Sequence, residues 1–276
     1  MIFISTNWNG KPAEQTDDCF DAMASNLSKA LKAEHRVIPL GPPQPHAWTL
    51  YIGYMKDVYR WLKVARPPGA KTAWMQEGDS SGMVDVSFAF TGRADSPKQV
   101  VIRAPFEPSL YVVEPKEKIV LVDHVSYRRD WTPQVLAMCE GLPAYWEVWL
   151  MSTTKPKEQI PLAVPPRVRV LPKMPMGEYL EQTSQVHTFI CTHAETYGYG
   201  VIDMAVRGTR VLAHKGGGGC LNSWFGVKAF DSQESFCETM LVQAENWSSA
   251  ASRCQKLCTP YADIAKIVAD KFITTE

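Results

Sequence analysis

Short apolar runs alternate with segments of helical period along the whole chain, and this alternation restricts the fold more than any other feature. The run at residues 1–6 is followed by a helical segment at 17–33 and by a second run at 36–40. Parallel strands joined by crossover helices produce this pattern, so the chain is predicted to be an α/β protein. Further strands are expected at residues 71–76, 84–90, 99–105, 119–125, 146–152, 167–172, 186–192, 209–215 and 227–230. Further helices are expected at residues 50–66, 132–140, near 179, and at 200–207, 232–245 and 263–272.

A proline-rich and charged segment, PFEPSLYVVEPKEK, divides the alternating pattern into two series. Domain boundaries commonly fall in such segments, so the boundary is placed near residues 114–118. The prediction is an N-terminal Rossmann-like domain over 1–115 and a C-terminal one over 116–276, whose last helix can pack back on the first domain.

The composition excludes several classes of protein. Lys plus Arg equals Asp plus Glu at 29 each, so the net charge offers no global attraction to nucleic acid or to an anionic membrane. No window reaches the roughly 18 apolar residues needed to span a bilayer. The seven cysteines form no C-x-x-C pair, and no metal site is expected, although Cys254 and Cys258 are spaced by one helical turn. A reduced, cytoplasmic location is expected, and nothing in the sequence indicates an oligomeric state.

The stretch THAETYGYGVIDMAVRGTRVLA, residues 192–213, is the most informative for chemistry. Glu195 falls in the loop after an expected strand, where open α/β sheets bind ligands, and Asp203 falls on the following helix. Gly198 and Gly200 would allow the backbone close to a ligand. A helix N-terminus at this point would attract a diphosphate, and the acids would accept hydrogen bonds from sugar and ribose hydroxyls. The alternative is a solvated loop acid and an acid favoured by the helix dipole alone.

This stretch resembles the E-x7-E signature of retaining GT-B glycosyltransferases, usually E-G-F-G-L-x-x-x-E-A-M-A-x-G-x-P-V. Glu195 matches the first acid and Tyr197 the aromatic residue, while Asp203 stands at the second acid and Arg210 at the proline. VDHVSYRRD at 122–130 resembles the family's V-G-R-L-x-x-x-K-G, which places Arg129 at the lysine. IRAPFEPSLY at 102–111 resembles the interdomain turn.

The resemblance implies a GT-B fold, in which two Rossmann-like lobes with parallel sheets face an interdomain cleft. It implies a nucleoside-diphosphate sugar as donor, a UDP-sugar by expectation, with Arg129 on the diphosphate, Glu195 on the sugar and Asp203 on the ribose. Transfer would be retaining and would require no metal or other cofactor. The donor-binding residues implied are Arg129, His124, Glu195, Tyr197, Gly198, Tyr199, Gly200 and Asp203. Gly217 lies in a glycine-rich loop, HKGGGGCLN at 214–222, which would follow the next strand beside the donor and is either a phosphate cradle or a flexible connection. Asn9 and Gly10, in the turn after the first strand, complete the set of candidate binding residues.

The acceptor side is less defined. Asn9 and Gly10 occupy the turn after the first strand, where the acceptor enters in the family. Many relatives carry a cleft histidine where this chain has WMQEGD, residues 74–79, so Glu77 or Asp79 could act as general base, and inversion would then become possible. The alternative is an ordinary polar loop. The catalytic candidates are therefore Glu195, Arg129, Glu77 and Asp79.

A basic stripe of Lys56, Arg60 and Lys63 on the helix expected at 50–66 suits a lipid surface, a nucleic acid or a solvated face. The compact first lobe resembles phage-type enzymes that glycosylate hydroxymethylated bases in DNA, which implies a DNA acceptor and, for a phage protein, the host cytoplasm. Lipid or saccharide acceptors remain alternatives. Two rival hypotheses are a non-catalytic GT-B module that binds a nucleotide or nucleic acid, and a nucleotide-sugar epimerase.

Overall fold

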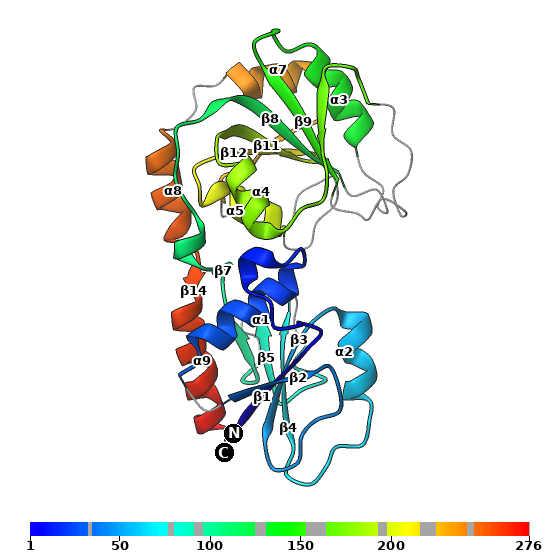
Figure 1. Ribbon diagram of the computed structural model, residues 1–276, viewed down its shortest axis with the longest axis vertical. Coiled ribbons are helices and arrows are strands. Elements are labelled where there is room, and N and C mark those ends of the chain that lie inside the picture. Colours follow the sequence, from blue (N-terminus) through cyan, green and yellow to red (C-terminus); the bar gives the residue numbers. More distant parts are fainter. Residues whose placement is uncertain are drawn as a thin grey trace. The chain divides into compact units, whose positions relative to one another are not determined.

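The computed structural model describes residues 1–32, 35–76, 80–90, 96–124, 131–152, 164–192, 198–215, 225–241 and 246–275. These residues form two compact units, each built on its own sheet (Figure 1). The first unit contains Met1–Leu110, Pro175–Gly177 and Cys258–Glu276, and the second contains Tyr111–Met174 and Glu178–Leu257. The last helix of the chain therefore belongs to the first unit.

The first unit is a parallel sheet of six strands with helices on both faces. Its strands are β1 (Ile2–Thr6), β2 (His35–Pro39), β3 (Trp48–Ile52), β4 (Lys71–Gln76), β5 (Val86–Ala89) and β6 (Gln99–Val101), in the order β2-β1-β3-β4-β5-β6. Its helices are α1 (Cys19–Ala30), α2 (Met55–Leu62), α9 (Tyr261–Thr274) and the short 3-10 helices η1 (Ala13–Gln15) and η2 (Pro108–Leu110). Two short strands, β7 (Pro105–Phe106) and β14 (Thr259–Pro260), pair with each other.

The alternation of side chains along β3 explains how both faces of this sheet are covered. Successive side chains of a strand point to opposite faces. Trp48 stacks on Phe272 of α9 with ring centroids 4.3 Å apart, whereas Tyr51 packs with Val58 of α2 and with Trp74. In Figure 1 α1 and α9 accordingly lie on one side of the sheet and α2 on the other.

The prediction of one helix over residues 50–66 is wrong, because this segment contains the end of β3 and the shorter helix α2. On α2, Met55 is 61% exposed and Tyr59 is 41% exposed, whereas Val58 is fully buried. The basic residues lie beside the exposed aromatic rings, with Lys63 Nζ 4.1 Å from the ring centroid of Tyr59.

The second unit is also a parallel sheet of six strands. Its strands are β8 (Glu117–His124), β9 (Glu147–Ser152), β10 (Val168–Leu171), β11 (Val186–Cys191), β12 (Arg210–His214) and β13 (Lys228–Phe230), in the order β10-β9-β8-β11-β12-β13. Its helices are α3 (Thr132–Glu140), α4 (Met176–Gln182), α5 (Tyr199–Ala205), α7 (Gln233–Leu241) and α8 (Trp247–Gln255). By sequence the strand order is third, second, first, fourth, fifth and sixth, which is the order of dinucleotide-binding Rossmann folds. The predicted α/β fold with parallel sheets is confirmed.

One face of the second sheet packs against α3 and α7. Val120, Leu150 and Ile190 of three neighbouring strands are buried with Leu136 of α3 and Phe236 of α7. On the other face, Arg207, which follows α5 and is 1% exposed, donates hydrogen bonds to Leu180 O at 2.7 Å and to Thr183 Oγ1 at 2.9 Å. Burying a guanidinium is costly unless its donors are paired, so these bonds fix the end of α5 against α4.

Helix α8 was not predicted from the sequence, and its bounds correct the pairing considered for two cysteines. Cys254 lies on α8, which ends at Gln255, whereas Cys258 follows the helix and belongs to the other unit. The two thiols are therefore not on consecutive turns of one helix. Among the helices that the structure describes, none is long and apolar enough to cross a bilayer.

Candidate functional site at the carboxyl edge of the second sheet

The carboxyl ends of β8 and β11 form the point at which the strand order of the second sheet reverses. The chain runs from β8 outward to β9 and β10 on one side, and then returns to β11, β12 and β13 on the other. At such a switch point the connections leave the two central strands in opposite directions, which opens a crevice where ligands of α/β proteins bind. Asp123 and Cys191 are paired in register at this point, directly before the segments that contain Arg129 and Glu195.

A set of hydrogen bonds fixes the backbone at the ends of these two strands. The Thr192 hydroxyl donates to Asp123 O at 2.5 Å and lies 2.7 Å from the hydroxyl oxygen of Thr132 at the start of α3. The amide of Trp131 donates to Thr192 O at 2.7 Å. Because Thr132 and Thr192 are both fully buried, these bonds form in a low-dielectric environment and hold β8, β11 and α3 in one arrangement.

Glycines occupy the positions where α5 begins, and the structure gives a separate reason for each. Gly198 has φ of 84° and ψ of 67°, a left-handed conformation that glycine adopts without steric cost. Gly200 has ordinary dihedrals, but a Cβ there would lie 3.2 Å from Cζ of Phe189 and 3.9 Å from Oδ2 of Asp123. The start of α5 therefore lies directly over β11 and beside the Asp123 carboxylate.

Asp203 lies in the second turn of α5 and is partly buried. Its Oδ1 accepts a hydrogen bond from the Tyr111 hydroxyl at 2.7 Å. Burial raises the pKa of Asp203 to about 6, while the bond from Tyr111 and the nearby Arg207 act in the opposite direction. A carboxylate has about four acceptor positions, so the bond from Tyr111 leaves capacity for a ligand hydroxyl.

A pair of stacked rings, which sequence reasoning missed, closes this edge at the end of β12. The rings of Trp131 and His214 are parallel within 17°, with centroids 4.8 Å apart, and Phe230 meets His214 edge-on at 5.8 Å. Burial lowers the pKa of His214, which favours the neutral imidazole, while Asp231 opposes the shift. The available signal was a histidine at the end of an expected strand, directly before the glycine-rich loop.

The structure describes some of the site residues predicted from the sequence and leaves others outside its described part. Gly198, Tyr199, Gly200 and Asp203 lie together at the start of α5 or on it. Asn9 and Gly10 lie in the turn after β1 of the first unit, where Asn9 Oδ1 accepts from the amide of Lys11 at 3.2 Å and Gly10 has φ of 86°. The residues that lie outside the described part of the chain are Glu195, Arg129, Glu77, Asp79, Tyr197 and Gly217, together with the side chain of His124. Within the described part of the chain, no three His, Cys, Asp or Glu side chains form a group that could hold a metal ion.

Comparison with known proteins supports the fold. No protein-family model matches the sequence, and no curated protein is significantly similar to it. Solved structures do match over almost the whole chain. Sucrose-phosphate synthase from Thermosynechococcus elongatus has a TM-score of 0.68 at 9% identity, covering 99% of this chain and 98% of its own. HepE from Anabaena in complex with UDP-glucose has a TM-score of 0.60 at 13% identity, covering 99% of this chain and 100% of its own. AviGT4, a glycosyltransferase involved in avilamycin A biosynthesis, has a TM-score of 0.61 at 15% identity, covering 98% of this chain and 96% of its own. The chain therefore has the GT-B fold of these proteins.

Proposed function

We propose that the protein is a glycosyltransferase that binds a UDP-sugar at the carboxyl edge of the second sheet. The observation that carries the proposal is the strand order, because it makes β8 and β11 neighbours at the switch point. The segments that resemble the family's two donor-binding motifs follow these two strands directly in the sequence. A similar fold in HepE, solved in complex with UDP-glucose, supports the choice of donor.

The described residues suit such a donor. Asp203, whose pKa is about 6, is mostly ionised at pH 7 and above, and in that state it accepts hydrogen bonds from ribose hydroxyls alongside the bond from Tyr111. Gly198 gives α5 its left-handed start, and Gly200 lets the helix begin close to Phe189 and beside Asp123. The stacked rings of Trp131 and His214 supply a flat wall at the same edge.

Transfer breaks the bond between the sugar's anomeric carbon and the phosphate oxygen, and the electron pair leaves with UDP. The acceptor oxygen forms the new bond to that carbon, and its proton passes to a base. We assign Arg129 to the departing diphosphate, where a guanidinium binds two phosphate oxygens at once, and Glu195 to the sugar hydroxyls. The stabilisation grows as negative charge builds on UDP, so it lowers the barrier.

The first experiment measures UDP release from a panel of UDP-sugars, with and without acceptors. Arg129→Ala should lower kcat by about 10²- to 10³-fold, the usual effect of removing one group that stabilises a developing charge. Arg169→Ala is the matched control, because Arg169 stacks on Trp149 at 4.8 Å on the edge strand β10, away from the switch point. Equal activity of the two variants would remove Arg129 from the mechanism. Binding of UDP-sugar without release or transfer would instead indicate the non-catalytic module.

The finer parts of the proposal concern stereochemistry and acceptor. We propose retention of the anomeric configuration, with hydroxymethylated DNA as acceptor, on the family resemblance of residues 192–213 and the compact first lobe. NMR of the transferred sugar distinguishes retention from inversion, which would instead point to Glu77 or Asp79 as base. Parallel assays with hydroxymethylated DNA, unmodified DNA, a lipid alcohol and a saccharide identify the acceptor. Transfer only to the lipid or the saccharide would refute the DNA assignment.

A further inference from the structure

A cavity of about 450 Å³ lies where the strands of the second sheet begin, at the edge opposite to their carboxyl ends. His187 is the second residue of β11, Arg210 the first of β12 and Lys228 the first of β13, while Lys116 directly precedes β8. β11 has six residues. His187 and Cys191, at the end of the strand, are four residues apart, so with a rise of about 3.3 Å per residue His187 lies roughly 13 Å from the edge proposed for the donor. The two sites are therefore separate.

The lining of this cavity is rich in cations. Five basic side chains contribute to it, and no Asp or Glu is among the described residues that line it. The five are Lys116, His187, Arg210, Lys228 and Arg253. The remaining wall is largely apolar and includes the buried residues Phe225 and Cys254. A charged site with apolar walls strengthens the attraction of an anion, because less water screens it.

The basic groups around the cavity raise one another's electrostatic energy. Burial, and to a smaller extent the neighbouring Arg207, lower the pKa of Lys116 to about 8, while Glu114 acts in the opposite direction. The pKa of His187 is also lowered, first by burial and then by Arg210, Lys116 and Lys118. The smaller part of each shift comes from neighbouring like charges, and a bound anion would relieve that part.

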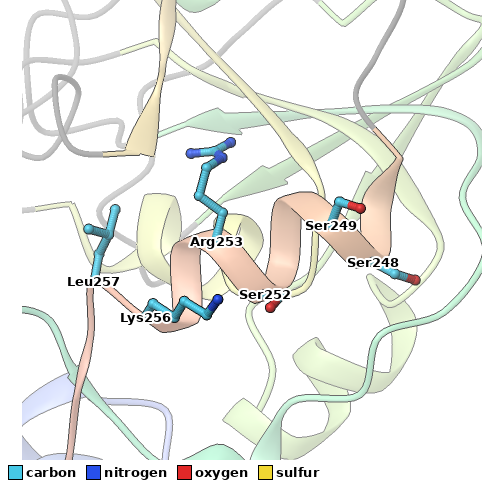
Figure 2. Close-up of a pocket in the computed structure, with 6 residues that line it drawn as sticks. All are labelled: Ser248, Ser249, Ser252, Arg253, Lys256 and Leu257. Atoms are coloured by element: carbon cyan, nitrogen blue, oxygen red, sulfur yellow. The ribbon is translucent and has the colours of Figure 1, made fainter.

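The basic lining continues onto the surface of α8. Arg253 lines both this cavity and a neighbouring hollow of about 650 Å³, which Figure 2 shows along the helix. In that view Arg253 leaves α8 on the other side from Ser252 and Lys256. The residues that line the hollow are Ser248, Ser249, Ser252, Arg253, Lys256 and Leu257. Arginine and lysine side chains are common phosphate ligands, so the hollow and the cavity, which share Arg253, offer similar chemistry to an anion.

We propose that this cavity binds a small phosphorylated molecule, held through its phosphate by the basic side chains and against Phe225 by its apolar part. The volume is within the range of small-molecule sites, about 300–1,000 Å³. A small ligand suits the cavity better than a nucleic acid, because the chain has no net charge with which to attract a polyanion. The proposed site does not depend on the glycosyltransferase assignment.

The experiment titrates the full-length protein with inorganic phosphate, pyrophosphate and glucose 6-phosphate, using calorimetry. Glucose and sodium chloride at matched ionic strength are the ligand controls. Saturable binding of a phosphorylated probe is expected. Lys228→Gln, at an exposed position that tolerates substitution, and Lys116→Gln should each weaken it by about five- to tenfold, a loss typical of one charge-assisted contact. Lys266→Gln, which removes the same charge from the first unit, should leave it unchanged.

Several results would overturn the proposal. No saturable binding of any phosphorylated probe would refute it, as would equal affinity in Lys228→Gln, Lys116→Gln and Lys266→Gln. Binding that is lost in Arg129→Ala but kept in Lys116→Gln and Lys228→Gln would place the ligand at the donor edge instead. Binding of duplex DNA by a Lys228-dependent contact, without binding of the small probes, would assign the surface to a nucleic acid.

Discussion

The turn between α5 and β12 approaches α8 so closely that only glycine fits at position 208. Gly208 has φ of +80°, and a Cβ built there would lie 2.0 Å from Trp247 O and 2.7 Å from Trp247 C. Both contacts are to backbone, so Gly208→Ala forces α8 away from the turn. The left-handed conformation costs a residue with a Cβ about 1–2 kcal/mol. Overpacking costs about 1–3 kcal/mol more. The expected loss is therefore about 2–5 kcal/mol.

Gly226→Ala, in the same unit, separates the cost of the left-handed backbone from the cost of overpacking. Gly226 also has a left-handed φ, +67°, but its nearest neighbour would be Nη1 of Arg253 at 3.9 Å. Its substitution should cost only the conformational part, about 1–2 kcal/mol. The assay is denaturant unfolding of both variants, followed by hydrogen exchange of the α8 amides. If Gly208→Ala were no less stable than Gly226→Ala, or if the α8 amides exchanged equally in both, the close approach inferred for this turn would be refuted.

Two further predictions concern single side chains. Tyr111→Phe removes the hydroxyl that favours ionised Asp203, so the pKa of Asp203 should rise further above about 6. Because its folded pKa exceeds the usual 3.8, this group lowers the free energy of unfolding as pH rises from about 4 to 6. The variant should extend that decline to higher pH, whereas an unchanged pH profile of stability would contradict the coupling. Phe272→Ala should cost about 3–5 kcal/mol, because its buried ring is stacked on Trp48, while the exposed neighbour Ile273→Ala should stay within about 0.5 kcal/mol by thermal unfolding.

The elements that the sequence predicts well are those whose pattern is local. β8, β9 and β11 each contain a run of three or four apolar residues buried inside a sheet, and α3 has a proline in its first turn, where a helix accepts one. Their bounds agree with the prediction within about two residues. The sequence places Gly198 and Gly200 where a ligand approaches, and the structure gives a different reason for each, a left-handed cap and a close approach to Phe189.

Other elements depend on interactions that no short window contains. α8 includes five serines and alanines in succession, which give little apolar period, although Asn246 before it is an N-cap whose side chain accepts from the amides of Ser248 and Ser249. That cap was the one local signal for the helix. β7 and β14 are two residues long and pair across more than 150 residues of sequence, so their pairing exists only in the folded chain.

The candidate site also depends on interactions between segments that are distant in the sequence. Alternating strands and helices predict a parallel sheet, but they do not specify which strands are neighbours. β8 and β11 lie side by side only because the chain crosses to β9 and β10 on one flank and then returns to the other. That reversal brings the carboxyl ends of the two strands together at the switch point, where open α/β sheets bind ligands. The motifs around Arg129 and Glu195 are each short and imperfect, and neither defines a site alone. The role proposed for them depends on strand order, which is a property of long-range packing.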